Sequence, residues 1–231
     1  DELYTATEQW HELLDTLERE IELTQMPEDQ KTLSWRVGRL WEEHLGDGLR
    51  AVEVYQEVLQ TDPDHAPSRE ALGGMILREE FAVEAAEVLR PIHEEAEEWD
   101  QLVEVLRALL TATQDPERKL ELLREIATIH EACREDKGSA FQALAEALAT
   151  RPGDEELLDQ LERLAEDLYA WDPYIDLLDE LIEQTDDFVA AGVMQLRVAR
   201  VYEERIQDIV AAIHRYERVL EQDPVDEDAL P

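Results

Sequence analysis

The sequence of residues 37–63 is VGRLWEEHLGDGLRAVEVYQEVLQTDP. Its order of small, apolar and proline residues returns at residues 126–152, IATIHEACREDKGSAFQALAEALATRP, and at residues 198–224, VARVYEERIQDIVAAIHRYERVLEQDP. The three copies have equal length and align without a gap. A register kept so strictly indicates that one supersecondary unit is reused along the chain.

A tryptophan lies at a fixed distance before each copy and extends the unit toward the N-terminus. Trp10, Trp99 and Trp171 each stand 28 residues before the Gly or Ala that follows the first residue of the copy. Apolar residues follow each tryptophan at the spacing of one face of a helix, which predicts an amphipathic helix there. The repeated units therefore cover residues 10–63, 99–152 and 171–224.

Two more helices are predicted within each unit, joined by a short turn at residues 45–48, 135–138 and 206–208. Glycines in the first two turns permit the left-handed conformation that ends a helix. The third turn has no glycine, so either Gln207 adopts that conformation or the turn has another shape. The second helix ends before proline, which disfavours helical geometry in the preceding residue.

The segments between the units are predicted to be helical as well. Residues 154–168 have the pattern of one helix, while the stretch 64–98 is 17 residues longer than its counterpart. We expect three helices there, one through Leu72 and Leu77, one over 81–89 and one over 91–97. The simplest interpretation of the added length is an extra short hairpin.

Charge limits the classes of partner. The chain has 59 Asp and Glu against 21 Lys and Arg, a net charge of −38. Such a surface repels nucleic acid and anionic membranes, so neither is expected as a partner. A basic protein or peptide would be attracted, although solubility alone is the more common reason for such acidity.

Localisation is predicted from what the sequence lacks. No apolar run is long enough to span a membrane, and the start of the chain has no signal-peptide pattern. The single cysteine, Cys133, permits a reducing compartment, so we expect a cytoplasmic protein. The sequence begins at Asp1 without methionine, which leaves room for an upstream segment.

Catalytic motifs are absent from the sequence, and we expect no enzyme, no cofactor and no metal. The six histidines do not form the His-Glu-x-x-His pattern, and His130 with Cys133 supplies only two of the three or four ligands that a metal needs. Gly73-Gly74 is the only glycine pair and lies in a helical pattern rather than a phosphate-binding loop. Paired carboxylates are expected by chance in so acidic a chain.

The repeated stretch resembles the tetratricopeptide repeat (TPR), in its bacterial tandem form. Val37-Gly38, Trp41, Ala51, Tyr55 and Pro63 match the family pattern, with one extra residue in the turn. The other copies match through Ile126-Ala127, Ala140, Leu144, Ala147 and Pro152, and through Val198-Ala199, Tyr202, Ala212, Tyr216, Val219 and Pro224. The resemblance implies an all-α fold, a right-handed α-solenoid of antiparallel helical hairpins over residues 1–231.

In TPR proteins the first helices of successive hairpins line a concave groove that holds a partner segment. The resemblance places eight candidate residues in that groove: Trp35, Arg39, Glu42, Arg124, Thr128, Leu196, Arg200 and Glu203. Trp35 has no aromatic equivalent in the other copies, and its neighbours already fill the core, so it is the predicted anchor. The chain contains no Asn and these positions have no Lys, which argues against the carboxylate clamp of chaperone-binding TPR proteins.

The leading hypothesis is a non-catalytic scaffold that binds a protein or peptide along this groove. Two alternatives stay open: an acidic chaperone or decoy for a basic protein, and a structural spacer whose length matters more than its surface. Residues 1–7 resemble the end of a preceding helix and residues 226–231 the start of another. We therefore expect a fragment of a longer array, with an oligomeric state that the sequence does not reveal.

Overall fold

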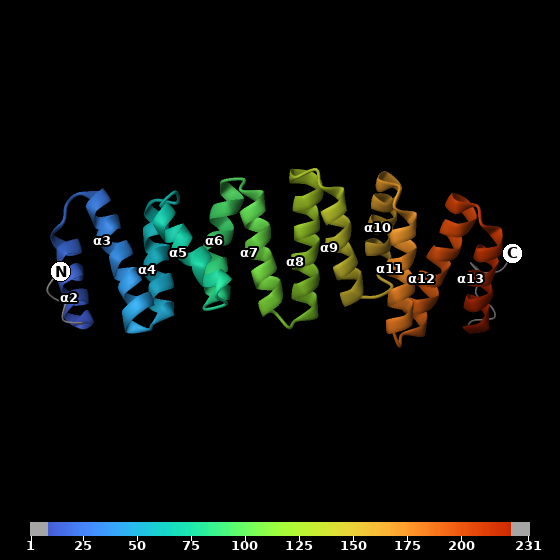
Figure 1. The fold of residues 1–231 in the computed structure, drawn as a ribbon, viewed down its shortest axis with the longest axis horizontal. Coiled ribbons are helices and arrows are strands. Elements are labelled where there is room, and N and C mark those ends of the chain that lie inside the picture. Colours follow the sequence, from blue (N-terminus) through green and yellow to red (C-terminus); the bar gives the residue numbers. More distant parts are fainter. Residues whose placement is uncertain (1–8, 223–231) are drawn as a thin grey trace. The chain divides into compact units, whose positions relative to one another are not determined.

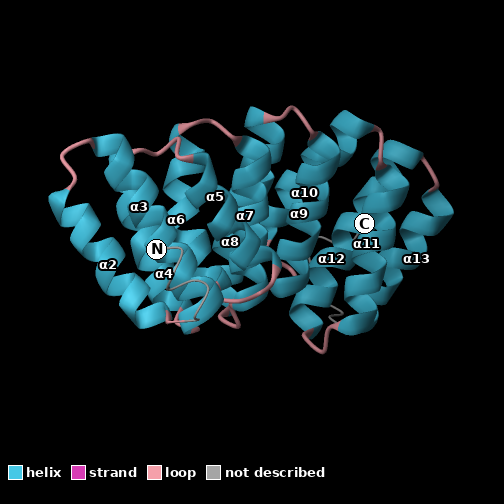
Figure 2. Ribbon diagram, turned by 60° about the vertical axis from the view of Figure 1, so that its left-hand side comes forward, coloured by secondary structure: helices cyan, strands magenta, loops and turns pink. Residues whose placement is uncertain are grey.

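A computed structural model describes residues 9–222 of the chain. Twelve α-helices and three π-helical turns form this part, and no strand occurs in it (Figure 2). The expectations for residues 1–7 and 226–231 lie outside the described residues. By its internal contacts the chain divides after Thr113 into two compact units.

The first unit stacks six α-helices in chain order, each packed on the next. They are α2 (Trp10–Leu23), α3 (Pro27–Leu40), the π-helical turn η1 (Trp41–Leu45), α4 (Gly48–Thr61), α5 (Ala66–Leu77), α6 (Ala82–Glu95) and α7 (Trp99–Ala112) (Figure 1). Helix α6 also touches α4. The connections are short, so neighbouring helices run antiparallel.

The second unit has the same plan. Its elements are α8 (Pro116–Thr128), η2 (Ile129–Cys133), α9 (Lys137–Thr150), α10 (Glu155–Leu168), α11 (Trp171–Gln184), α12 (Phe188–Arg200), η3 (Val201–Ile206) and α13 (Ile209–Gln222) (Figure 1). Consecutive helices again pack on each other. The fold is an all-α solenoid, as predicted.

Each hairpin turn is built in the same way. A π-helical turn ends the first helix, and the backbone amides of Asp47, Asp136 and Asp208 donate to carbonyl oxygens six residues earlier, at 3.2, 2.8 and 2.9 Å. The aspartate side chain then accepts a hydrogen bond from a backbone amide three residues later and caps the second helix. The repeat register thus extends to single hydrogen bonds.

The residue before that aspartate is left-handed in all three turns, at Gly46 (φ 71°), Glu135 (φ 53°) and Gln207 (φ 63°). Of the two alternatives for the third turn, the structure has the left-handed Gln207. The glycine of the second turn was assigned wrongly, because Gly138 lies inside α9 and Glu135 takes the left-handed conformation instead.

Close contact within the first hairpin depends on a glycine. A Cβ at Gly38 in α3 would lie 2.4 Å from ring atom Cε1 of Tyr55 in α4. Tyr55 is fully buried and donates its hydroxyl to a carboxylate oxygen of Glu42 at 2.7 Å. Burial, and after it this hydrogen bond, raises the pKa of Tyr55 well above its usual range. The ring is therefore held tightly against the glycine.

The prediction of three helices in residues 64–98 is wrong. Helices α5 and α6 occupy this segment and pack on each other, and Pro91 lies inside α6 rather than at its start. Proline removes one helical hydrogen bond. Ala85, Ala86 and Leu89 on one side of it and His93 on the other are buried, and this packing keeps the helix continuous.

The recurring tryptophans begin their helices, as predicted, but they are half-buried rather than core residues. Trp10 stacks on His44 with ring centroids 3.8 Å apart. Trp171 meets the ring of Tyr174 edge-on and the guanidinium of Arg205 over its face. Leucines such as Leu17, Leu106 and Leu178 supply the buried contacts one to two turns later.

Candidate functional site

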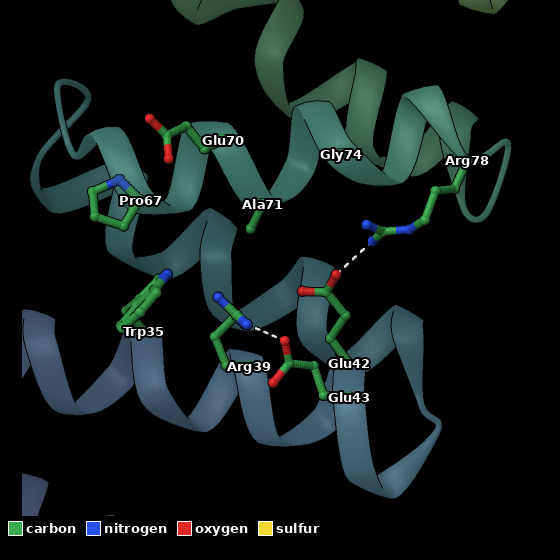
Figure 3. Close-up of a pocket in the computed structure, with 9 residues that line it drawn as sticks. All are labelled: Trp35, Arg39, Glu42, Glu43, Pro67, Glu70, Ala71, Gly74 and Arg78. Atoms are coloured by element: carbon green, nitrogen blue, oxygen red, sulfur yellow. Dashed lines mark hydrogen bonds and ion pairs between the residues drawn. The ribbon is translucent and has the colours of Figure 1, made fainter.

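A pocket of about 250 Å³ lies in the first unit, between the α3–η1 segment and α5 (Figure 3). Trp35 and Arg39 from α3 and Glu42 and Glu43 from η1 form one wall. The facing wall consists of Pro67, Glu70, Ala71 and Gly74 of α5 together with Arg78. Small residues on α5 leave the space open above the indole ring (Figure 3).

The indole of Trp35 is the polar feature that the fold leaves unsatisfied in this pocket. Its Nε1 atom is buried and finds no hydrogen-bond partner among the described residues. The guanidinium of Arg39 lies over the ring, 5.5 Å from its centroid. Buried donors are nearly always paired, so an unpaired one at a pocket wall marks a position where a bound acceptor is favourable.

The charged groups around the ring are paired with each other. Arg39 binds Glu43, and Arg78 of the α5 end binds Glu42 (Figure 3). The hydrogen bond to Glu43 is also the main reason that the pKa of Arg39 is raised. The walls are thus held in place before any ligand arrives. A ligand would find Trp35 as the free donor between two satisfied ion pairs.

Glu42 has a structural role that the sequence did not reveal. Besides lining the pocket, it accepts the hydroxyl of Tyr55 from α4 and the guanidinium of Arg78. It therefore ties α4 and the α5 end to η1. Both of its carboxylate oxygens have partners within the hairpins, and its role in binding a partner stays a prediction.

Arg124 holds the repeat position of Trp35, 89 residues later, but the second unit has an ion-pair network there. Its Nη2 atom lies 3.6 Å from Asp154 and 3.1 Å from Glu156, at the start of α10. The hydroxyl of Thr128 donates to the carbonyl oxygen of Arg124 at 2.8 Å. Arg124 thus links α8 to α10 across the gap that Trp35 leaves open between α3 and α5.

The remaining predicted residues also lie in the second unit. Leu196 is half-buried on α12, and Arg200 is exposed at the end of that helix. Glu203 in η3 accepts the hydroxyl of Tyr216 at 2.9 Å, as Glu42 does from Tyr55. Of the eight candidates, the structure brings Trp35, Arg39 and Glu42 together in one pocket and does not place the other five in it.

Neither metal-binding nor membrane-spanning features occur in the part of the chain that the structure describes. Residues 9–222 contain no group of three or more His, Cys, Asp or Glu side chains arranged to hold a metal ion. Within the same range, every helix is too short or too polar to cross a bilayer.

No protein-family model matches the chain, and no curated protein matches it. Solved structures match it at low similarity, among them these three. PilF of Pseudomonas aeruginosa is 14% identical, over 88% of this chain and 96% of that one, with a TM-score of 0.32. A thermophilic TPR protein of Thermus thermophilus is 20% identical over 86% and 94%, with a TM-score of 0.29. The C-terminal part of a TPR repeat-containing protein of Cytophaga hutchinsonii is 12% identical over 99% and 96%, with a TM-score of 0.35.

Three hairpins of this chain share one register, one pattern of small and aromatic residues, and one turn geometry. The chain is an all-α helical repeat array whose hairpins resemble the TPR. Small residues of the TPR pattern stand where its helices cross, as Ala51, Ala140 and Ala212 do in complete or nearly complete burial.

A second polar cluster in the TPR-like array was not predicted from the sequence. Arg69 of α5 binds both His93 of α6 and Glu98, and Nδ1 of His93 lies 2.6 Å from an oxygen of Glu98. Burial, and after it the charge of Arg69, lowers the pKa of His93 to about 4. In the neutral imidazole, Nδ1 either accepts from the guanidinium of Arg69 or donates to Glu98, according to the tautomer. These residues lie outside the repeated units or at their margin, so the register gave no signal for them.

Proposed function

We propose that the chain is a non-catalytic scaffold and that the pocket between α3 and α5 binds an extended segment of a partner protein. The observation that supports this most directly is the buried, unpaired indole nitrogen of Trp35 at the pocket wall. A backbone carbonyl of a peptide is an acceptor that can satisfy it. The guanidinium of Arg39 stacked on the ring keeps the indole in place.

The chemistry of the pocket fits binding better than catalysis. Four of its five charged side chains are consumed in two ion pairs, and Glu70 is exposed and unpaired among the described residues, so no acid–base pair is poised beside the indole. Tryptophan and arginine are also the residues most often found at binding hot spots. A cytoplasmic location and a partner with basic residues, which the net charge of −38 would attract, belong to the same proposal.

The proposal is tested by selecting peptides from a displayed library on the immobilised chain at about 0.15 M salt, the physiological ionic strength. Synthetic copies of the selected peptides are then titrated by fluorescence anisotropy. We expect Trp35→Ala to weaken binding by about tenfold. Trp35→Phe keeps an aromatic ring but removes the N–H donor, and it should weaken binding by less. Arg50→Ala is the matched control, because Arg50 is exposed on α4 and pairs only with Glu53 in its own helix.

The alternatives give different results in the same experiment. An acidic chaperone would select basic peptides that bind Trp35→Ala as well as the parent and are released by about 0.5 M salt, where exposed charges are screened. A structural spacer would select no peptide above background. Either outcome would reject the pocket as the partner site.

A further inference from the structure

A second cavity in the first unit lies on the other side of α5. It has a volume of about 840 Å³ and is bounded by α5, the second half of α6 and α7. Glu70 and Gly74 border both this cavity and the Trp35 pocket, so the two hollows adjoin across α5. Helices α5 and α6 come from the 64–98 segment, where the second unit has only α10 at the corresponding place. The cavity is therefore a feature of this segment rather than of the repeat.

Apolar side chains form much of its lining. The lining includes Ile76 and Leu77 of α5, Leu89 of α6, and Val103 and Val105 of α7. Leu77 is 86% exposed. Covering a leucine that is so open to water, at the edge of an apolar cavity, is favourable for a partner with apolar side chains. The wall thus favours an apolar occupant.

The glycine pair of α5 keeps this wall open. Both Gly73 and Gly74 line the cavity, and a Cβ at Gly73 would meet no atom within 4 Å. Glycine in a helix interior costs helix stability relative to alanine. No close helix contact in the first unit requires a glycine at position 73. The effect of the missing side chain is that the space above Gly73 stays open.

The polar groups that line the cavity, besides Asp64, Gln101 and Arg107, are a satisfied set and two free carboxylates. Arg69, His93 and Glu98 are bonded to each other at one end. Glu70 on α5 and Glu104 on α7 are exposed at the rim and have neither an ion pair nor a hydrogen bond among the described side chains. Two unpaired carboxylates beside an apolar surface attract a partner that carries cations next to its apolar side chains.

We propose that this cavity binds an amphipathic helix of a partner protein, with neighbouring Leu, Ile or Met side chains inserted between α5 and α7 and Lys or Arg beside Glu70 and Glu104. The volume exceeds the need of one side chain and suits the several anchors that a helix presents at i, i+3 and i+4. This site is separate from the Trp35 pocket and does not depend on the function proposed for it.

The probe is a fluorescein-labelled peptide of 14 residues that contains only Leu and Lys, with Leu on one helical face. Its binding is followed by fluorescence anisotropy at about 0.15 M salt. We expect saturable binding to the parent, no binding of an analogue with Glu in place of Lys, and no binding of an analogue with Ala in place of Leu. Trp35→Ala should bind the probe like the parent, which separates this site from the proposed function.

Two variants locate the probe on the protein. Gly73→Leu fills the cavity from a position with free space, and we expect it to weaken binding at least tenfold. Gly192→Leu is the matched control, because Gly192 also lies within a helix and has open space around it, but in the second unit. Circular dichroism at 222 nm confirms that both variants keep their helices.

The carboxylates are tested in the same titration. Glu70→Gln with Glu104→Gln should weaken binding severalfold, whereas Asp176→Asn with Glu183→Gln on α11 should not. Asp176 holds the repeat position of Glu104, 72 residues later, and is exposed. The proposal is overturned if Gly73→Leu binds the probe like Gly192→Leu, or if the Ala analogue binds as well as the Leu probe, since charge alone would then explain the binding.

Discussion

Arg163 of α10 binds both carboxylate oxygens of Glu131 in η2, at 2.6 and 2.8 Å. Glu131 holds the same repeat position as Glu42, which binds Arg78 at the end of α5. In both units a glutamate of the π-helical turn therefore ties the hairpin to the helix that follows it. The conserved geometry identifies this glutamate as a structural element of the repeat.

The Arg163–Glu131 pair should contribute measurably to stability. The hydrogen bond from Arg163 is the main reason that the pKa of Glu131 is lowered, and burial opposes it. Because the folded pKa lies below the unfolded one, this contribution is present above the unfolded pKa and is lost as the pH falls through the folded pKa. We expect a coupling free energy of about 0.5 to 1 kcal/mol in a double-mutant cycle of Glu131→Gln and Arg163→Gln, measured by urea unfolding at pH 7. If the effects of the two single variants on the free energy of unfolding simply add, the Arg163–Glu131 pair does not stabilise the fold and the prediction is wrong.

The ring of Tyr55 fills the space that Gly38 leaves free by having no side chain. Gly38→Ala should destabilise the protein by about 1 to 3 kcal/mol, because the new Cβ would overlap a ring that is fixed by Glu42. The second copy has Ala127 and Leu144 at these two positions, and the third has Ala199 with Tyr216, whose ring is only partly buried. Adding Tyr55→Leu to Gly38→Ala should therefore recover part of the loss in thermal unfolding. Gly192→Ala, which meets no atom within 4 Å, is the control and should not destabilise.

The repeat register predicted most of the fold, and its failures have local causes. Residue type alone predicts Gly138 as the left-handed residue, because glycine adopts that conformation without strain. The turn instead places Glu135 there, since the aspartate cap and its hydrogen bond to the preceding turn fix the geometry in every copy. Aligning Glu135 with Gly46 and Gln207 would have found it, because register was the stronger signal than residue type.

Two features of residues 64–98 were missed for another reason: helix α6 continues through Pro91, and α5 faces Trp35. Pro91 predicts a helix boundary by local rules, but the burial of Ala85, Leu89 and His93 along α6 overrides it. The sequence did single out Trp35, since the other two copies have no aromatic residue at its position. It did not reveal the facing wall, because α5 lies outside the repeated register and its residues had no aligned partner.

The left-handed positions predict two stabilising substitutions. Glu135→Gly and Gln207→Gly should each stabilise the protein by about 1 kcal/mol, because side chains with a Cβ are strained at φ 53° and 63°. Gly46→Ala should destabilise by a similar amount for the same reason. Gly138→Ala is the discriminating control, since Gly138 is helical and a Cβ there makes only ordinary contacts. If Gly138→Ala were as damaging as Gly46→Ala in urea unfolding, the assignment of the turn would fail.

His93 should make stability depend on pH in a defined window. Its pKa is lowered to about 4 in the folded chain by burial and by Arg69, while an unfolded histidine titrates near 6.5. The unfolded state therefore binds the proton first, and stability falls as the pH drops from about 7 to 5, by about 2 kcal/mol for this group. His93→Gln removes the titration. The carboxylates change both proteins alike, so the difference between parent and variant in urea unfolding should shrink toward pH 5. Parallel pH profiles would show that folding leaves the pKa of His93 unchanged, and a difference that grows toward pH 5 would show that His93 is protonated in the fold and paired with Glu98 as an ion.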